Sequence, residues 1–298
     1  MRADPDPNST SIPQLVARRA AHWQLKTRML ELPRRPLIMG IINVTPDSFS
    51  DGGQFFATSA AVDHALELIA EGADILDIGG ESTRPYSEIV PAEEELRRVL
   101  PVVEAVTRQS RIPISIDTSK AAVAEAAIDA GVEIINDVTA LTGDAAMLEV
   151  AVRRGAGICA MHMLGTPQTM QDNPAYDDVV AEVIGYLRSR REVLEAAGIS
   201  RDRICLDPGI GFGKTREHNV DLMRHSYRLH ALGSPVLVGH SRKGFLGKLI
   251  GDKDGDRTNA TVWSSLSLAV QGVHVIRVHD VRLVREALTV FEATGGLT

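Results

Sequence analysis

The 298-residue sequence has few aromatic residues, few cysteines and no long apolar run. Phe, Trp and Tyr make up 4% of the chain, so the core must consist mainly of Val, Ile, Leu and Ala, the residues that fill parallel strands. Cys159 and Cys205 each lie within an apolar run, and without a secretory context they are expected to be buried and unreactive. No stretch approaches the ~18 apolar residues of a membrane span, and the N-terminus lacks a signal-peptide pattern. We therefore predict a cytoplasmic protein with no membrane partner.

Clustered positive charge is absent as well. The chain carries 32 Lys and Arg against 39 Asp and Glu, a net charge of −7. A protein that holds a nucleic-acid backbone needs a basic face, so no nucleic-acid partner is expected. The hydrophobic content of 44% and the charged content of 24% are those of an ordinary globular protein.

Eight short apolar runs alternate with segments of helical periodicity and predict eight strands. The runs are LIMGIIN, ADILDIG, IPISID, VEIIND, GICAMHM, RICLD, PVLVGH and VHVIRVH. Parallel strands joined by crossover helices form a (β/α)₈ barrel, in which eight such units make one domain. We predict an α/β fold, a TIM barrel over residues 36–298, with a doubly wound sheet as the alternative. Residues 1–35 form an N-terminal extension, in which apolar side chains between about Ile12 and Leu32 predict a capping helix.

Polar side chains end every predicted strand. In a barrel these positions share one rim, where active sites are built, so a site for a small polar molecule is expected there. Strand ends also meet solvent, which explains part of this pattern in any α/β protein. In strand order, the residues are Asn43, Asp77, Asp117, Asn136 with Asp137, His162, Asp207, His240 with Lys243, and Arg277 with His279.

The loops after the strands carry cations whose roles the residues alone leave open. In GGESTRPY, Arg84 could bind a carboxylate or pair with the glutamate of the same loop. In GHSRKG, Lys243 could be a Schiff-base nucleophile, a cation for a ligand oxygen or a solvated lysine. Arg277 and His279 alternate onto one face of the last strand, where they could hold phosphate or form an ion pair with Asp280 or another carboxylate.

The segment DPGIGFGKT comes close to two nucleotide-binding motifs and matches neither. A Walker A loop needs glycine where Pro208 stands, and a dinucleotide fingerprint needs glycine where Lys214 stands. The glycines are instead expected to shape a tight turn that exposes Phe212 and orients Asp207. No HExxH motif for a transition metal occurs.

Eight motifs occur in an order and spacing that resemble the dihydropteroate synthase family. They are NVTPDSFSDGG, DIGGESTRP, SIDTSK, INDV, MHM, LDPGIGFGK, GHSRKG and RVHDV, from about Leu37 to Val281. The resemblance implies a (β/α)₈ transferase that joins 6-hydroxymethyl-7,8-dihydropterin pyrophosphate to p-aminobenzoate in folate biosynthesis and releases pyrophosphate. It also implies a homodimer and a sulfonamide target. One departure is Tyr86, at a position where many members have glycine.

The resemblance further implies roles for single residues. Asn43 would hold a Mg²⁺ cofactor, for which an amide oxygen is an apt ligand, and catalysis would involve Asp117, Lys243, Arg277 and His279. The implied pterin-binding residues are Asp117, Asn136, Met161, Asp207, Lys243 and Arg277, those for p-aminobenzoate are Thr83, Arg84, Pro85, Phe212, Ser241 and Phe49, and those for pyrophosphate are Asn43, Arg277 and His279.

Two other functions are compatible with such a barrel. Methyltransferases that pass a methyl group from methyltetrahydrofolate to a corrinoid share the pterin-reading carboxylates, but their chemistry does not require the STRP or SRK motifs. A pterin-binding homologue without turnover would be marked by the loss of Asn43, Lys243 or Arg277, and all three are present.

Overall fold

The computed structural model describes residues 19–45, 53–84 and 86–297, and its main feature is a closed sheet of eight parallel strands. Hydrogen bonds join the strands in the order β8, β7, β6, β5, β4, β3, β10, β9, and a bridge between Leu206 and Val236 connects β8 to β9. Each predicted run contains one strand, which confirms the TIM barrel and excludes the doubly wound sheet. The strands are β3 (Leu37–Asn43), β4 (Ile75–Gly79), β5 (Ile114–Asp117), β6 (Ile134–Asp137), β7 (Gly157–Met161), β8 (Ile204–Asp207), β9 (Leu237–Gly239) and β10 (Val275–Val278).

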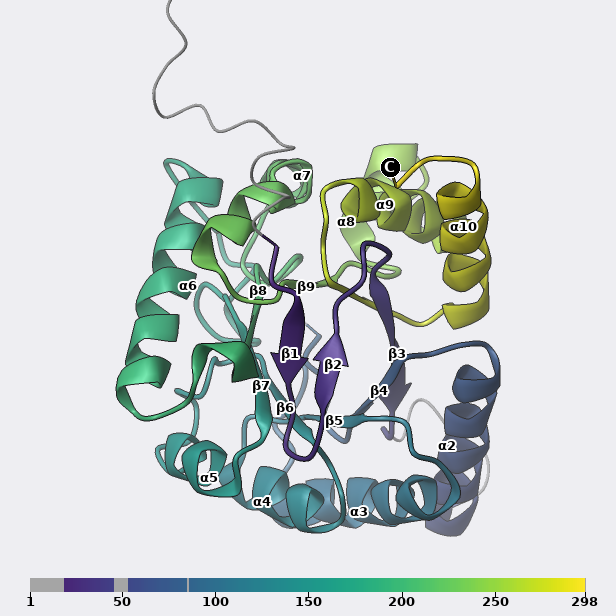
Figure 1. Cartoon of the computed structure of the whole chain (residues 1–298), viewed down its shortest axis with the longest axis vertical. Coiled ribbons are helices and arrows are strands. Elements are labelled where there is room, and N and C mark those ends of the chain that lie inside the picture. Colours follow the sequence, from purple (N-terminus) through teal and green to yellow (C-terminus); the bar gives the residue numbers. More distant parts are fainter. Residues whose placement is uncertain (1–18, 46–52, 85, 298) are drawn as a thin grey trace, which may run out of the picture.

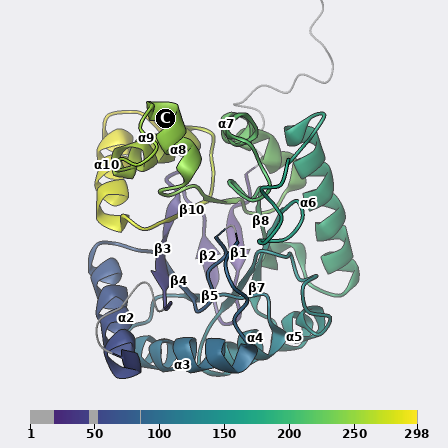
Figure 2. The ribbon, with the colours of Figure 1, turned by 180° about the vertical axis from the view of Figure 1, so that it is seen from behind.

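Helices follow the strands and form a ring outside the barrel (Figures 1 and 2). Gly72 and Gly131, each two residues after the end of a helix, have φ values of 96° and 112°, a left-handed backbone that favours glycine. Among the described residues, no helix is long and apolar enough to cross a membrane. The helices are α2 (Gly53–Ala70), α3 (Ala92–Gln109), α4 (Ala121–Asp129), α5 (Met147–Arg154), α6 (Val179–Ala196), α7 (Arg216–Arg224), α8 (Gly244–Ile250), α9 (Thr258–Val270) and α10 (Val281–Ala293), with short 3₁₀ helices at Arg201–Arg203 and Ser226–Leu232.

The alternation of side chains along the strands separates the core of the barrel from its functional end. Residues two apart on a strand point to the same side. A lower layer inside the barrel is fully buried and consists of Met39, Ile75, Ile134, Cys159, Cys205, Leu237 and Val275. Both cysteines are buried free thiols, as predicted. Two residues further along, the same strands carry Ile41, Asp77, Asn136, Met161, Asp207, Gly239 and Arg277, so the polar layer lies directly above the apolar one.

The N-terminal extension contains a β-hairpin where a capping helix was predicted, so that prediction is wrong for the described residues. β1 (His22–Gln24) pairs antiparallel with β2 (Met29–Glu31), and the hairpin lies across the barrel in Figure 1. Trp23 and Leu25 are fully buried against the lower layer. A strand places residues two apart on one face, which a helix does not. Residues 12–18 of the predicted helix lie outside the description.

We expect Trp23→Ala to destabilise the protein by about 3–5 kcal/mol, the usual cost of emptying a large buried aromatic site. Trp23 is 0% exposed and its Nε1 donates a hydrogen bond to the Arg203 carbonyl at 3.1 Å. Urea unfolding measures the change, with Met29→Ala, at a 52% exposed hairpin position, as the matched control. Equal stability of the two variants would show that the hairpin does not contribute to the barrel core.

Candidate active site

A cavity lies at the C-terminal ends of the strands, and all eight strands or their following loops contribute to it. Only three of its lining residues, Ile41, Val138 and Gly239, were not in the predicted site, because two are apolar and the third has no side chain. The lining consists of Ile41, Thr83, Asp117, Asn136, Val138, Met161, Asp207, Phe212, Gly239, Ser241, Lys243, Arg277 and His279.

Arg277 joins two buried carboxylates at the floor of this cavity. Its Nε donates to Asp77 Oδ2 at 2.5 Å and its Nη2 donates to Asp117 Oδ2 at 2.7 Å. Asn136 Nδ2 donates to the same Asp77 oxygen at 3.1 Å. Of the carboxylate partners that the sequence left open for Arg277, Asp280 pairs with a different arginine. Residues from β4, β5, β6 and β10 are therefore held in one polar network.

The charge of Asp117 depends on Arg277. Burial raises the pKa of Asp117 above its usual range, Arg277 counteracts this rise, and other carboxylates, Asp77 among them, add to it. A carboxyl group removed from water favours its neutral form unless a cation compensates. Arg277 is thus the group that favours the ionised form of Asp117.

Asp207 and Lys243 lie on the opposite side of the cavity floor. Asp207 Oδ1 accepts a hydrogen bond from the Gly209 N–H at 2.7 Å, and burial raises the pKa of Asp207. Lys243 Nζ donates to the Ile210 carbonyl and lies 4.4 Å from the centre of the Phe212 ring. Burial lowers the pKa of Lys243 to about 8, and Asp207 opposes that shift. These surroundings exclude the solvated-lysine alternative.

Lys214 is a buried cation that the sequence reasoning did not assign to the site. It is 3% exposed, and its Nζ donates to the Phe212 carbonyl at 2.9 Å and lies 3.0 Å from His162 Nδ1. Burial lowers the pKa of Lys214 to about 7 and that of His162 to about 3, so the imidazole is neutral and accepts from the amine. The sequence signal that could have identified Lys214 is its place in the glycine-rich, largely apolar segment DPGIGFGKT.

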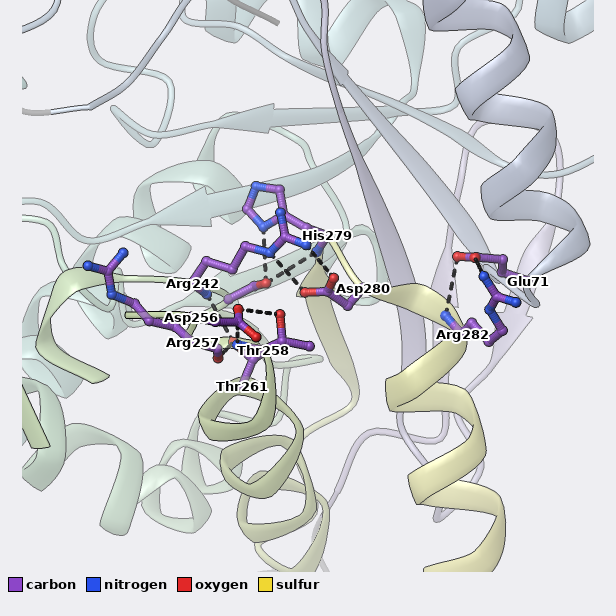
Figure 3. Close-up of polar contacts among 10 residues, drawn as sticks. Glu71, Arg242, Asp256, Arg257, Thr258, Thr261, His279, Asp280 and Arg282 are labelled. Carbon is purple, nitrogen blue, oxygen red and sulfur yellow. Dashed lines mark hydrogen bonds and ion pairs between the residues drawn. The ribbon is translucent and has the colours of Figure 1, made fainter. Parts of the chain in front are cut away.

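A second network joins the loops after β9 and β10 (Figure 3). His279 Nδ1 lies 3.0 Å from Ser241 Oγ, which also accepts from the His279 backbone N–H at 3.2 Å. Arg242, with φ of 56°, donates from its backbone to Thr261 Oγ1 at 3.0 Å and from its guanidinium to Asp280. Burial lowers the pKa of His279 to about 4, so His279 is a neutral hydrogen-bonding group near pH 7.

The loop after β4 is anchored by Glu81, which does not pair with Arg84. Lys120 Nζ lies 2.5 Å from Glu81 Oε2 and 2.6 Å from Glu95 Oε2. Glu81 Oε1 accepts from the Val90 N–H at 2.8 Å. The base of this loop is therefore fixed to α3 and to the start of α4.

Two predicted site residues within the described ranges, Asn43 and Arg84, are not among the residues that line the cavity. Asn43 ends β3 beside the neighbouring strand, in register with Gly79, and Arg84 is exposed in the loop after β4. Phe49 and Pro85 lie outside the described residues. The structure therefore brings together the predicted pterin-binding set and part of the predicted p-aminobenzoate set.

Comparison with known proteins identifies the family to which this chain belongs. Residues 39–279 match the family model of the pterin binding enzymes. The chain belongs to the pterin-binding enzyme family. It is 47% identical to the dihydropteroate synthase of Escherichia coli (strain K12) over 259 residues, 87% of this chain and 92% of that protein. These findings confirm the family predicted from the eight motifs.

Solved structures of pterin-binding enzymes show the same fold. Dihydropteroate synthase from Xanthomonas albilineans with 4-aminobenzoic acid matches with a TM-score of 0.86 and 47% identity, over 92% of this chain and 98% of that chain. The Yersinia pestis dihydropteroate synthase in a sulfonamide drug complex matches with a TM-score of 0.85 and 43% identity, over the same shares.

Proposed function

We propose that the cavity at the C-terminal ends of the strands is where this chain carries out the dihydropteroate synthase reaction. The enzyme is a transferase that joins 6-hydroxymethyl-7,8-dihydropterin pyrophosphate to p-aminobenzoate, giving 7,8-dihydropteroate and pyrophosphate in folate biosynthesis. The observation that carries the placement is the meeting of Asp117, Asn136, Asp207 and Lys243, from four different strands or their loops, in one cavity.

The cavity floor suits the hydrogen-bonding pattern of a pterin ring. A pterin presents an N–C(NH₂)–N edge, from which the Asp207 carboxylate accepts paired hydrogen bonds. Lys243 donates to the ring carbonyl and the adjacent nitrogen, and Asn136 supplies a further polar contact. Met161, which is 4% exposed, provides apolar surface for the ring face. The pterin therefore lies deep, below the loops.

The condensation needs no covalent bond to the enzyme. Loss of pyrophosphate leaves a cationic pterin, which the weakly nucleophilic aniline nitrogen attacks. The Asp117 carboxylate stabilises the developing cation. Arg277 favours the ionised form of Asp117 and also binds the oxygens of the leaving pyrophosphate. His279 Nδ1 lies 3.0 Å from Ser241 Oγ, so in the tautomer that carries its proton on Nε2 the neutral imidazole donates a hydrogen bond from Nε2 to pyrophosphate.

The upper part of the cavity suits p-aminobenzoate. Thr83, Phe212 and Ser241 line it from loops above the polar layer. The Phe212 ring offers a face for the aminobenzoate ring, and the Thr83 and Ser241 hydroxyls offer donors. Arg84, exposed beside Thr83, is positioned in the same loop to bind the carboxylate. Sulfonamides, which mimic p-aminobenzoate, would occupy this part.

Mg²⁺ fits the donor set as an ion that arrives with the pyrophosphate. In the described ranges, no group of three or more His, Cys, Asp or Glu side chains could hold a metal. Mg²⁺ usually keeps several waters and binds one or two protein oxygens together with substrate phosphates. The amide oxygen of Asn43 would be its protein ligand, and the bound ion would neutralise charge on the leaving group.

We expect Asn43→Ala to raise the Mg²⁺ concentration needed for half-maximal activity by roughly tenfold, because one oxygen ligand is lost. Initial rates across a Mg²⁺ titration measure the shift. Gln109→Ala, which removes an exposed amide side chain at the end of α3, is the matched control and should leave the titration unchanged. Undiminished wild-type activity in excess EDTA would contradict the metal requirement, and an unchanged titration for Asn43→Ala would contradict this ligand.

We further propose a homodimer formed across α9 and α10. These helices pack side by side, and large apolar side chains are exposed on them, including Trp263 at 72% and Val290 at 62%. Exposed apolar surface of this kind is typical of interaction sites. Light scattering of the full chain should give twice its 32.2 kDa mass, and a monomer at assay concentration would contradict the dimer.

The cytoplasmic location stays a prediction.

The proposed reaction is tested by pyrophosphate release with both substrates, each substrate alone and neither. Release that requires both, with 7,8-dihydropteroate formed in equal amount, is the expected result. Release without p-aminobenzoate incorporation would contradict the condensation. Methyl transfer from methyltetrahydrofolate to a corrinoid, without pyrophosphate release, would instead identify the methyltransferase alternative.

A further inference from the structure

The loop after β7, residues 162–178, connects two loops that lie on opposite sides of the proposed p-aminobenzoate site. Toward the loop after β4, Pro167 O accepts from the Tyr86 backbone N–H at 3.2 Å, and Asp172 Oδ1 accepts from the Tyr86 hydroxyl at 3.1 Å. Toward the loop after β8, Gln171 Nε2 donates to the Gly211 carbonyl at 2.8 Å. We call residues 162–178 the β7 loop.

The first of these connections spans the mouth of the barrel. β4 and β7 are not neighbours, because β5 and β6 lie between them in the sheet. A hydrogen bond between their following loops therefore bridges the two strands between them, β5 and β6, whose ends carry Asp117 and Asn136. No residue of the β7 loop lines the cavity, so the loop acts on the cavity through the two loops that it joins.

Tyr86 has an unfavourable backbone conformation and an exposed side chain, so its hydrogen bond to Asp172 is the contact that explains its position. Its φ is 63°, in the left-handed region that non-glycine residues adopt at an energetic cost and mainly where surroundings impose it. The side chain is 66% exposed, so burial does not compensate that cost. Asp172 precedes Asn173, whose φ of 53° is also left-handed. Both ends of the hydrogen bond thus lie in tight turns that orient the two side chains.

The connected loops carry the residues that would contact the second substrate. Tyr86 is three residues from Thr83, which lines the cavity. Gly211 precedes Phe212, whose ring lies against the Lys243 amine at 4.4 Å. A change in the β7 loop would therefore alter the separation of Thr83 and Phe212, and not the polar layer below them.

We propose that the β7 loop sets the width of the p-aminobenzoate site, and that Tyr86 and Asp172 are specificity-determining residues for the aryl amine. The proposal rests on the function proposed above. Tyr86 and Asp172 act by positioning, since neither lines the cavity. While the Tyr86 hydroxyl is hydrogen-bonded to Asp172, the site excludes an aryl amine that carries a bulky ring substituent. When this hydrogen bond is removed, the site admits such an aryl amine.

Four variants test the pair through steady-state kinetics. Tyr86→Phe and Asp172→Ala each remove the hydrogen bond, and we expect each to raise the KM for p-aminobenzoate roughly three- to tenfold, the range for one hydrogen bond. Asp172→Asn keeps an acceptor oxygen and should behave like the wild type. Tyr227→Phe, in a 3₁₀ helix away from the cavity, is the control. For all variants, kcat and the KM for pterin pyrophosphate should stay within about twofold.

Relative use of a ring-substituted p-aminobenzoate should rise in Tyr86→Phe and Asp172→Ala. Equal effects on both substrates, or a fall in kcat with unchanged KM, would overturn the specificity role. Hydrogen exchange without substrate gives an independent readout: the backbone amides of Arg84, Tyr86 and Ser87 should exchange faster in both variants than in the wild type. Unchanged exchange would overturn the connection itself. If exchange is faster in the variants but the wild type releases no pyrophosphate, the connection stands and the proposed function is contradicted.

Discussion

Lys243→Ala is expected to lower kcat/KM by about 10²-fold or more, the scale of losing one preorganised electrostatic group. Lys243 is positioned by the Ile210 carbonyl and the Phe212 ring, so its amine needs no reorganisation to meet a pterin carbonyl. Burial lowers the pKa of Lys243 to about 8. Wild-type kcat/KM should therefore decline above about pH 8 as the ammonium form is lost.

Two controls separate this role from others. Lys248→Ala removes an exposed lysine from α8 and should leave kcat/KM unchanged, whereas Lys243→Arg keeps the charge and should move the decline to higher pH. Near wild-type turnover by Lys243→Ala would contradict the role in binding. Borohydride trapping of a covalent adduct on Lys243 would show a Schiff base, and the noncovalent role would then be wrong.

Arg277→Met should have the larger effect, a loss of about 10³-fold in kcat/KM, together with a lower free energy of unfolding. The substitution leaves Asp77 and Asp117 buried without their cation, and breaking a buried pair in this way costs about 3–5 kcal/mol. The double variant Arg277→Met/Asp77→Asn should regain part of the stability and none of the activity. Urea unfolding and initial rates measure the two effects separately.

The stability loss of Arg277→Met should depend on pH with a defined sign. Arg277 counteracts the rise in the pKa of Asp117, so its removal moves the folded-state pKa further above the unfolded value of about 3.9. The folded variant then binds more protons than the unfolded chain, and its stability falls as pH rises between those two values. The wild type shows the same decline up to the folded-state pKa of its Asp117, about 7, so the deficit should begin to grow near pH 7 and be largest above the folded-state pKa of the variant.

The matched control is Arg282→Ala. Arg282 is 64% exposed and its Nη2 lies 3.1 Å from Glu71 Oε1, an ion pair also visible in Figure 3. Exposed pairs contribute less than about 1 kcal/mol. A pH-independent loss in Arg277→Met, similar to that of Arg282→Ala, would show that Arg277 does not compensate the buried carboxylates.

Local pattern was sufficient to predict the eight strands, because each apolar run is short and is followed by a helical segment. The polar residues at the strand ends followed from the same pattern once the barrel closed. The hairpin could not be predicted in this way: Trp23 and Leu25 share a face only because the lower layer of a distant barrel buries them. Tertiary burial outweighed a weak helical periodicity.

Partners within the site were harder to predict than its members. The sequence suggested Asp280 or another carboxylate as an ion-pair partner of Arg277 without naming which, and Asp280 pairs with Arg242. The true partners, Asp77 and Asp117, come from strands that only the closure of the sheet brings together. Sequence proximity carries little information about pairing across a barrel.

The hairpin that packs against the lower end of the barrel limits the route by which substrates reach the proposed sites. Trp23 and Leu25 pack against that end, and the residues that line the cavity lie at the opposite, C-terminal ends of the strands, so we expect both substrates to enter and both products to leave on that side. The substrate that binds deepest must enter first, and nothing beneath the aryl amine can be exchanged while it is bound. Substrate binding is therefore expected to be ordered, and a large excess of the aryl amine should inhibit the reaction because it blocks the entry of pterin pyrophosphate.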